Sequence, residues 1–367
     1  MQKNKSVKVL IAGGGTGGHV FPAIAIANAL KKLNPSVQIR FVGATGRLEM
    51  TKVPDAGYPI EGLWISGFQR GNIFKNILLP VQIMTSLFKS YILITRFKPD
   101  VVVGVGGYAS GPPLFVSAVL SVPVLIQEQN SFAGVTNKMM AKRAMRFCVA
   151  YDGMEKFFPA EKIVKTGNPV REDIVRLVRH PEKSRKYFDL SPQKKTILVI
   201  GGSLGSKTIN ECFIKGTRKI IDKGYQLIWQ TGKTYYESVK SAVTSHPDIK
   251  IYDFIKEMNY AYDAADVIIS RAGAIAISEL CCVGKPVILV PSPNVAEDHQ
   301  TKNALALVEK RAAWIVRDIN AEEMLVKKTL ELLANEEEQK ELSTNIAKLA
   351  MPNAATRIAE EILTLAQ

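Results

Sequence analysis

One arrangement occurs twice in this chain: an apolar strand, a glycine-rich turn and the start of a helix follow one another. The first copy has the strand 8–12 and the turn GGGTGGH at 13–19, and the second has the strand 196–200 and the turn GGSLGS at 201–206. Glycine has no Cβ, so backbone N–H groups in such a turn can approach an anion closely, and the positive end of the following helix points to the same place. We therefore expect two sites for phosphate or pyrophosphate, with a cleft between two domains.

Strand-like runs alternate with helical patterns along the whole chain, which is typical of βαβ units and a parallel sheet. The predicted strands of the first half lie near 7–13, 38–43, 101–106, 123–128, 146–151 and 162–166. Those of the second half lie near 196–202, 226–231, 249–254, 267–271, 287–291 and 313–317. A chain of 367 residues is also too long for one ordinary core. The pattern predicts an α/β fold with two domains.

The turn-rich segment GNPVR at 167–171 suits a hinge between the two halves. We expect a first domain over 1–166 and a second over 167–352. The last segment, 353–367, has apolar residues at helical spacing, and we expect this helix to pack back on the first domain.

Composition narrows the class of protein. The chain has 47% hydrophobic and 22% charged residues, as soluble globular proteins do, and its four cysteines show no C-x-x-C spacing. We therefore expect no disulfide, no zinc site and a reducing cytosol. No secretory segment and no transmembrane helix is predicted. The net charge of +14 favours anionic partners, among which nucleic acid, a membrane surface and phosphorylated substrates all remain open.

The first turn matches the dinucleotide pattern G-x-G-x-x-G at Gly13, Gly15 and Gly18. Dehydrogenases of that class place an acidic residue at the end of the second strand to bind the ribose. The strand 38–43 ends without one, and so does the strand 226–232 of the second half. Neither turn has the G-x-x-x-x-G-K-[ST] pattern of a P-loop. These absences argue against a nicotinamide enzyme and against a P-loop NTPase.

Polar residues follow other predicted strands, at the edge where open α/β sheets bind ligands. Gln127, Glu128 and Asn130 suit sugar hydroxyls. Glu279 lies in an otherwise apolar helix, where a carboxylate facing a cleft could accept both hydroxyls of a ribose; the alternative is an exposed helix charge. His19 stands directly after the first glycine turn, with a capping or packing role as its alternative.

Seven motifs follow one another along the whole chain: GGGTGGH at 13–19, GGYASGP at 106–112, EQN at 128–130, GNPVR at 167–171, GGSLGS at 201–206, SRAGAIAISE at 270–279 and DHQTKNA at 298–304. In order and spacing they resemble the membrane-associated N-acetylglucosaminyltransferases of bacterial peptidoglycan synthesis. The resemblance implies the GT-B architecture, in which two Rossmann-like domains with parallel sheets face each other across a cleft. It also implies inverting transfer of N-acetylglucosamine from UDP-GlcNAc to the C4 hydroxyl of undecaprenyl-pyrophosphoryl-MurNAc-pentapeptide (lipid I), giving lipid II.

The same resemblance implies roles for individual residues. In the second domain, the backbone of Ile255 would bind uracil, Glu279 the ribose hydroxyls, and Ser203 and Arg171 the pyrophosphate. The sugar and its surroundings would be bound by Gln300, Ala274, Ile275, Ala276, Ile277 and Ser278. The groups of the first domain that would close over the donor are Thr16, Gly17, Gly18 and Asn130. The glycine turns at 13–18 and 104–111 would take the acceptor pyrophosphate.

Inverting transfer needs a base at the attacking hydroxyl and stabilisation of the charge that develops on the departing UDP. We expect His19 to be the base, because an imidazole takes up a proton near neutral pH, with Glu128 in reserve. A helix N-terminus and Arg171 can stabilise the leaving group, so neither a metal nor another cofactor is expected.

The segment 72–98 is unusually apolar and carries interspersed basic residues, as interfacial membrane anchors do. We expect Ile73, Phe74, Ile77, Leu78 and Leu79, with Lys75, to dock on anionic lipid, and only this portion to be exposed. The protein would then be peripheral, on the cytoplasmic face of the bacterial membrane, with cell-wall synthesis proteins as candidate partners and no nucleic acid. A diacylglycerol glycosyltransferase of the same fold and a non-catalytic UDP-sugar-binding protein are the alternatives.

Overall fold

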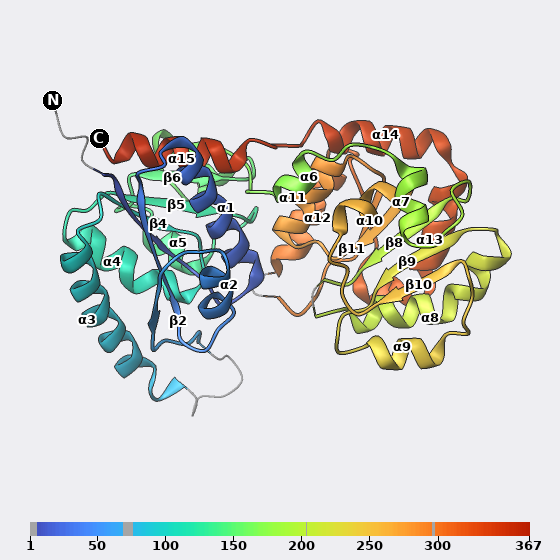
Figure 1. Ribbon diagram of the computed structural model, residues 1–367, viewed down its shortest axis with the longest axis horizontal. Helices are drawn as coiled ribbons and strands as arrows, with labels where there is room; N and C mark the ends of the chain where they lie inside the picture. Colours follow the sequence, from blue (N-terminus) through green and yellow to red (C-terminus); the bar gives the residue numbers. More distant parts are fainter. Residues whose placement is uncertain (1–5, 69–75, 203, 296–297) are drawn as a thin grey trace. The chain divides into compact units, whose positions relative to one another are not determined.

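A computed structural model describes residues 6–68, 76–202, 204–295 and 298–367 of the chain (Figure 1). The chain forms two compact units. The first contains the residues up to Val170 together with Pro352–Gln367, and the second contains Arg171–Met351.

The described strands of the first unit form one sheet in the order β3-β2-β1-β4-β5-β6-β7, and all its neighbouring strands are parallel. The strands are β1 (Lys8–Ala12), β2 (Gln38–Ala44), β3 (Ile60–Leu63), β4 (Val101–Gly104), β5 (Val124–Glu128), β6 (Arg146–Val149) and β7 (Ile163–Lys165). Strand β1 lies between β2 and β4, with Ile11 opposite Phe41 and Val103. The glycine turns that follow β1 and β4 therefore lie at one edge of the sheet.

Helices cover both faces of this sheet. They are α1 (Gly17–Leu33), α2 (Glu49–Asp55), α3 (Leu79–Phe97), α4 (Gly111–Val119), α5 (Val135–Met139) and α15 (Ala354–Leu365). Helix α15 packs against α1, and the two lie side by side in Figure 1 although one ends the chain and the other begins it. Ile26 and Leu30 of α1 share a core with Ile358 and Ile362 of α15. A second core, on the α3 and α4 side, includes Leu93 and Leu114.

The second unit has a sheet in the order β10-β9-β8-β11-β12-β13 over its described strands, and all its pairs are parallel. The strands are β8 (Thr196–Ile200), β9 (Gln226–Gln230), β10 (Ile249–Tyr252), β11 (Val267–Ser270), β12 (Val287–Leu289) and β13 (Trp314–Ile315). In both sheets the first strand of the unit lies in the interior, third from one edge, and later strands extend the sheet in both directions, which is the doubly wound arrangement. The predicted α/β fold with two parallel sheets is confirmed.

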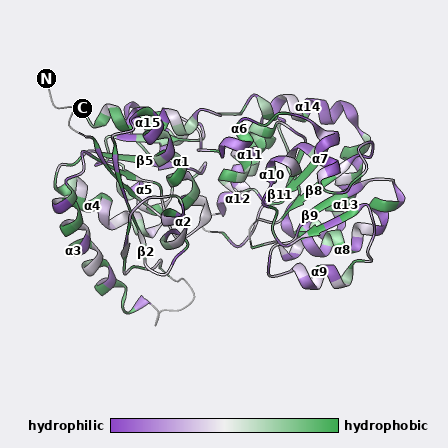
Figure 2. Cartoon of the chain, in the orientation of Figure 1, coloured by the Kyte–Doolittle hydropathy of each residue, from purple (hydrophilic) through white to green (hydrophobic). Residues whose placement is uncertain are grey.

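The helices of the second unit are α6 (Glu172–Val175), α7 (Pro181–Tyr187), α8 (Lys207–Asp222), α9 (Tyr236–Ala242), α10 (Met258–Ala264), α11 (Ala274–Val283), α12 (His299–Val308), α13 (Ala321–Ala334) and α14 (Glu336–Ala347). Strands β8 and β9 are strongly hydrophobic and lie inside, while α8 and α13 alternate between polar and apolar residues (Figure 2). The core on that side includes Phe213 of α8, Trp229 of β9 and Leu325 of α13.

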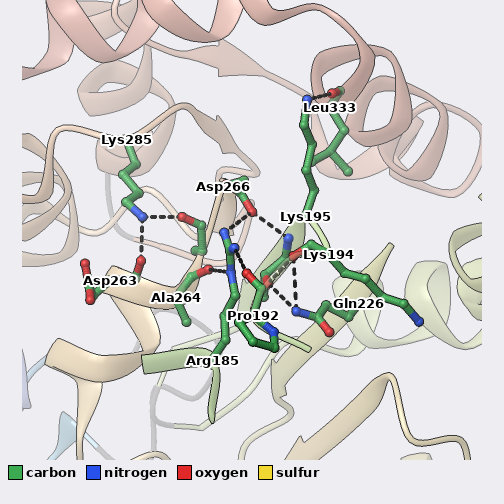
Figure 3. Close-up of polar contacts among 12 residues, drawn as sticks. Arg185, Pro192, Lys194, Lys195, Gln226, Asp263, Ala264, Asp266, Lys285 and Leu333 are labelled. Atoms are coloured by element: carbon green, nitrogen blue, oxygen red, sulfur yellow. Dashed lines mark hydrogen bonds and ion pairs between the residues drawn. The ribbon is translucent and has the colours of Figure 1, made fainter. Parts of the chain in front are cut away.

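A polar cluster at the amino ends of β8 and β11 fixes the segment that leads into the second sheet (Figure 3). Asp266, one residue before β11, accepts hydrogen bonds from the Thr196 backbone N–H at 2.7 Å and from Arg185 at 2.8 Å. Arg185 also donates to the carbonyl oxygen of Ala264 at 3.1 Å. Since ligands of such sheets bind at the carboxyl ends of the strands, this cluster serves the fold.

Candidate functional sites in the two units

The two glycine turns of the first unit pack against each other. The backbone N–H of Gly14 donates to the carbonyl oxygen of Gly106 at 3.4 Å. Gly107 has a φ of +81°, and a Cβ at this position would lie 2.3 Å from the carbonyl oxygen of Gly14. A side chain is therefore excluded by backbone conformation and by space, so Gly107 is required for the turns to meet.

His19 lies in the first helical turn of α1 and packs against the glycine-rich loop that follows β4. A Cβ on Gly106 would approach the imidazole to 2.8 Å at Cδ2 and 2.9 Å at Nε2. Nδ1 of His19 is 3.2 Å from Oγ1 of Thr16. The ring is half-buried, while Thr16 and Gly18 are exposed. The predicted base, together with Thr16, Gly17 and Gly18, thus lies at the edge of the sheet where the two turns meet.

Glu128, at the end of β5, is engaged with the loop that follows it. Its carboxylate accepts hydrogen bonds from the backbone N–H groups of Asn130 and Gly134, both at 3.0 Å, and from Nδ2 of Asn137 at 2.8 Å. The side chain is 3% exposed. These contacts explain Glu128 as the residue that shapes the loop carrying Asn130, and they make it a poor candidate for the reserve base.

Buried amides connect this loop to the motif at 167–171. Gln127 donates through Nε2 to Oδ1 of Asn168 at 2.8 Å, and Asn168 donates through Nδ2 to the carbonyl oxygen of Gln129 at 3.0 Å. Gln129 in turn donates to the carbonyl oxygen of Val105 at 2.7 Å, beside the second glycine turn. The network therefore fixes the loop after β5 relative to that turn.

Glu49 is a residue of this site that the sequence pattern does not reveal. Its side chain is 1% exposed, and its carboxylate accepts from the backbone N–H groups of Gly15 and Ala44, each at 2.9 Å. It lies at the start of α2, after the end of β2. In the sequence it is a single acidic residue without a motif, and so it cannot be told from a surface charge.

In the second unit, Glu279 of α11 lies at the centre of a polar cluster. Arg171 donates through Nε to Oε1 of Glu279 at 2.9 Å, and the hydroxyl of Tyr262 donates to Oε2 at 3.1 Å. Glu279 is 9% exposed, so its interpretation as an exposed helix charge is wrong. Burial, and next the negative charge of Glu279, raise the pKa of Tyr262 well above its ordinary value. Tyr262 is therefore a neutral donor to the carboxylate.

The glycine turn of the second unit, at 201–206, is shaped by a neighbouring loop. Gly205 has a φ of +82°, and a Cβ there would lie 2.0 Å from the carbonyl oxygen of Thr231. Ser206 caps α8 by accepting from the backbone N–H of Ile209 at 3.3 Å. Arg271, directly after β11, donates to Oγ of Ser206 at 2.5 Å and also pairs with Asp318. Ser203, the predicted pyrophosphate ligand in this turn, lies outside the described residues.

The other residues predicted to bind UDP-GlcNAc lie along the same edge of the sheet. The backbone N–H of Ile255 donates to Oε1 of Gln230 at 2.9 Å. Oε1 of Gln300 accepts from the backbone N–H groups of Ala272 and Ser292, at 3.2 and 2.9 Å. The first turns of α11 contain Ala274, Ile275, Ala276, Ile277 and Ser278. A Cβ built on Gly273, just before this helix, would meet no atom within 4 Å, so the approach to the helix start is open.

The described residues include no group of three or more histidine, cysteine, aspartate or glutamate side chains arranged to hold a metal ion. Likewise, no helix in the described ranges is long and apolar enough to cross a membrane.

Helix α3 and the two residues before it carry an apolar surface that we call the α3 surface. Its members are the exposed residues Ile77, Leu78, Val81, Ile83, Met84, Phe88 and Tyr91. Ser86, Ser90 and Leu93 form the buried side of the helix. The expectation that only 73–79 is exposed is therefore wrong, because exposed apolar residues continue along α3 to Tyr91. Ile73, Phe74 and Lys75 lie outside the described residues, and Leu79 is half-buried.

Known proteins resemble the chain over its whole length. Residues 9–149 match the glycosyltransferase family 28 N-terminal domain, and residues 196–358 match the C-terminal domain of that family. The UDP-N-acetylglucosamine–N-acetylmuramyl-(pentapeptide) pyrophosphoryl-undecaprenol N-acetylglucosamine transferase of Bacteroides fragilis is 56% identical over 99% of this chain and 96% of its own. The enzyme of the same name from Cytophaga hutchinsonii is 53% identical, over 100% and 98%.

Among solved structures, MurG of Acinetobacter baumannii is 30% identical and has a TM-score of 0.79, with 98% of this chain and 99% of that chain covered. The sequence identity to these relatives, over nearly the full length of both chains, is higher than a shared fold alone would give. The chain therefore belongs to the family of UDP-N-acetylglucosamine–N-acetylmuramyl-(pentapeptide) pyrophosphoryl-undecaprenol N-acetylglucosamine transferases, and it is a glycosyltransferase.

Proposed function

We propose that this protein transfers N-acetylglucosamine from UDP-GlcNAc to the C4 hydroxyl of lipid I, with inversion at the anomeric carbon, and so forms lipid II. The observation that carries the proposal is the 56% identity to an enzyme named for this transfer, over 99% of the chain. The described sites are compatible with it, since each unit has a glycine turn at the carboxyl edge of a parallel sheet.

The second unit is proposed to bind the donor. Glu279 would accept the ribose hydroxyls, Arg171 and Ser203 would bind the pyrophosphate, and the backbone of Ile255 would bind uracil. The ion pair between Arg171 and Glu279 supports this assignment, because a carboxylate and a guanidinium held side by side suit a diol and an adjacent phosphate. Gln300 and residues 274–278 would surround the sugar, next to the open start of α11.

The first unit is proposed to bind the acceptor pyrophosphate through its turns at 13–18 and 104–111. The N–H groups of Gly17 and Gly18, the first two residues of α1, precede the helical i to i−4 pattern and suit an anion, while that of His19 donates to the carbonyl oxygen of Thr16 at 3.1 Å. This unit is also proposed to contact UDP-GlcNAc, through Thr16, Gly17, Gly18 and Asn130.

His19 is the proposed base. It lies on the turn assigned to the acceptor, and its Nδ1 is oriented by Thr16 at 3.2 Å. The carboxylate of Glu128 instead accepts hydrogen bonds from two backbone N–H groups of the loop that follows it and from Asn137 of α5. The base would take the proton of the C4 hydroxyl as its oxygen attacks the anomeric carbon, while the bond to UDP breaks. Arg171 and the start of α11 would stabilise the charge on the departing UDP.

The α3 surface is proposed to dock on anionic lipid at the cytoplasmic face of the membrane. Its exposed apolar side chains suit insertion at the interface, and the neighbouring exposed Arg96 and Lys98 suit lipid phosphates.

A direct assay tests the proposed reaction. Purified protein is incubated with radiolabelled UDP-GlcNAc and a lipid I analogue, and the product is separated and its anomeric configuration determined. The expected product is a β-linked disaccharide, since UDP-GlcNAc carries an α linkage. Product with diacylglycerol but none with lipid I would contradict the proposal in favour of a diacylglycerol glycosyltransferase, and UDP-GlcNAc binding without any turnover would favour a binding protein.

A further inference from the structure

We infer that Glu49 is a positioning residue that holds the first glycine turn in the shape needed for the acceptor. This inference rests on the proposed function, because it concerns the turn assigned there to the acceptor pyrophosphate. Glu49 begins α2, and its two carboxylate oxygens connect the glycine turn after β1 with the end of β2: Oε2 accepts from Gly15, and Oε1 accepts from Ala44.

Two glycines leave room for this side chain. A Cβ on Gly43 would lie 2.4 Å from Cγ of Glu49, and the three nearest atoms around it all belong to Glu49. A Cβ on Gly14 would lie 2.1 Å from Oε1 of Glu49. The space at both glycines is therefore filled by the protein's own carboxylate, so Gly14 does not serve the close approach of a ligand from this side.

The carboxylate acts as an internal anion. In a dinucleotide-binding turn, the glycine N–H groups face a pyrophosphate. Here Glu49 takes the N–H of Gly15, and a buried charge with two N–H donors fixes the backbone firmly. The turn thus presents only its later part, Thr16 to His19, to a ligand. Displacing the carboxylate would release Gly15 and shift His19, which follows it by four residues.

The test compares Glu49→Gln, Gly43→Ala, Glu49→Ala and the double variant Gly43→Ala/Glu49→Ala. Glutamine has one acceptor oxygen and would face one of the two N–H groups with its own NH₂. Glu61→Gln is the matched control, because Glu61 is a solvent-accessible glutamate of the same unit. For each variant, kcat and KM for the lipid I analogue, the affinity for UDP-GlcNAc and the amide exchange of residues 13–19 are measured.

We expect Glu49→Gln to lower kcat/KM for the lipid I analogue by about 10²-fold, the scale of a misplaced reacting group. UDP-GlcNAc affinity should change much less, because most of the proposed contacts with UDP-GlcNAc lie in the second unit. Amide exchange over 13–19 should become faster. Gly43→Ala should show the same two effects but add nothing in the Glu49→Ala background, because the atoms it displaces are then gone. Glu61→Gln should behave as the parent.

Wild-type kcat/KM in Glu49→Gln, or a lower melting temperature with kinetics and exchange unchanged, would overturn the inference. So would an effect of Gly43→Ala that persists in full in the Glu49→Ala background. If Glu49→Gln does not fold, Gly43→Ala alone tests the same displacement with the carboxylate retained. Failure of the wild-type protein to use lipid I would count against the proposed function instead, and amide exchange over 13–19 would still decide whether Glu49 holds the turn.

Discussion

Arg171 and Glu279 are joined by an ion pair of 2.9 Å between Nε and Oε1, although 108 residues separate them in the sequence. Arg171 begins the second unit, and Glu279 lies in its α11 helix. Tyr262 donates to the other oxygen of the same carboxylate. Glu279 is therefore oriented from two sides, so its carboxylate can meet a ligand with little loss of conformational freedom.

Replacing Glu279 with Ala should weaken UDP binding by about 1–3 kcal/mol, the scale of hydrogen bonds to a charged group. Isothermal titration calorimetry with UDP measures this. Tyr262→Phe is a matched control, because it keeps the carboxylate and removes only the donor to Oε2; its effect should be smaller. Equal UDP affinity in Glu279→Ala and the parent would contradict the assignment to the ribose.

His19→Ala should lower kcat by about 10²–10⁴-fold with UDP-GlcNAc affinity nearly unchanged, as expected on loss of a general base. Steady-state kinetics with the lipid I analogue measure the effect. Glu128→Gln should act differently, because it disturbs the loop containing Asn130 and lowers the melting temperature. Full kcat in His19→Ala, or a change confined to the KM of the acceptor, would assign another residue as base.

The fold could be predicted because buried parallel strands are short apolar runs that alternate with helices. Strand β3 was missed, since its residues Ile60–Leu63 include Glu61 and Gly62 and only Leu63 is buried. Such an edge strand has no strong pattern of its own and forms because β2 offers it hydrogen bonds.

The site could be predicted only in part. Glycine turns and Glu279 are visible in the sequence, because glycines cluster and an acid is rare in an apolar helix. Glu49 and Tyr262 are not visible, since their importance comes from partners brought close only by folding: Gly15 for Glu49, and Glu279 for Tyr262. The same holds for the extent of the α3 surface, because periodicity does not tell which side of an apolar helix the sheet covers.

Activity should persist in EDTA, because Arg171 and the start of α11 are expected to stabilise the departing UDP without a metal. The rate with the lipid I analogue is measured before and after extensive chelation. Loss of activity that magnesium or manganese restores would show that this electrostatic account is wrong.

The Cys148 thiol should make stability depend on pH in alkaline solution. Burial, and next the charge of Glu361, raise its pKa from 9.0 to about 12. The thiol of the unfolded chain has the ordinary pKa of 9.0, so between pH 9 and about 12 the unfolded chain loses this proton while the folded chain keeps it. The free energy of unfolding should therefore fall as pH rises above 9. The slope for this one group is at most about 1.4 kcal/mol per pH unit.

Cys148→Ala removes this contribution. Urea unfolding of the parent and the variant between pH 8 and 10.5, with a thiol reductant present, should show the difference in stability changing in favour of the variant as pH rises. A difference that stays constant over this range would mean that the thiol does not titrate differently in the folded and unfolded chain.

The α3 surface should account for membrane docking, and described residues allow the test. Replacing Ile77, Met84 and Phe88 together with Ser removes three side chains that are 64%, 67% and 66% exposed. Their exposure means that the substitutions bury no new polar group and leave the fold intact. Binding to anionic vesicles should fall, because apolar insertion acts together with basic residues worth about 1 kcal/mol each near the surface.

Cosedimentation with vesicles at low and high salt measures the binding, and UDP affinity reports on the second unit, which should be unaffected. Val178→Ser/Ile319→Ser is the matched control: these side chains are 71% and 89% exposed but lie in the second unit, so the variant should cosediment as the parent does. A loss of binding in this control would point to general surface hydrophobicity rather than to α3. Parent-like binding of the α3 triple variant would show that the α3 surface has another use, since apolar side chains inserted at the interface cannot be removed without weakening attachment.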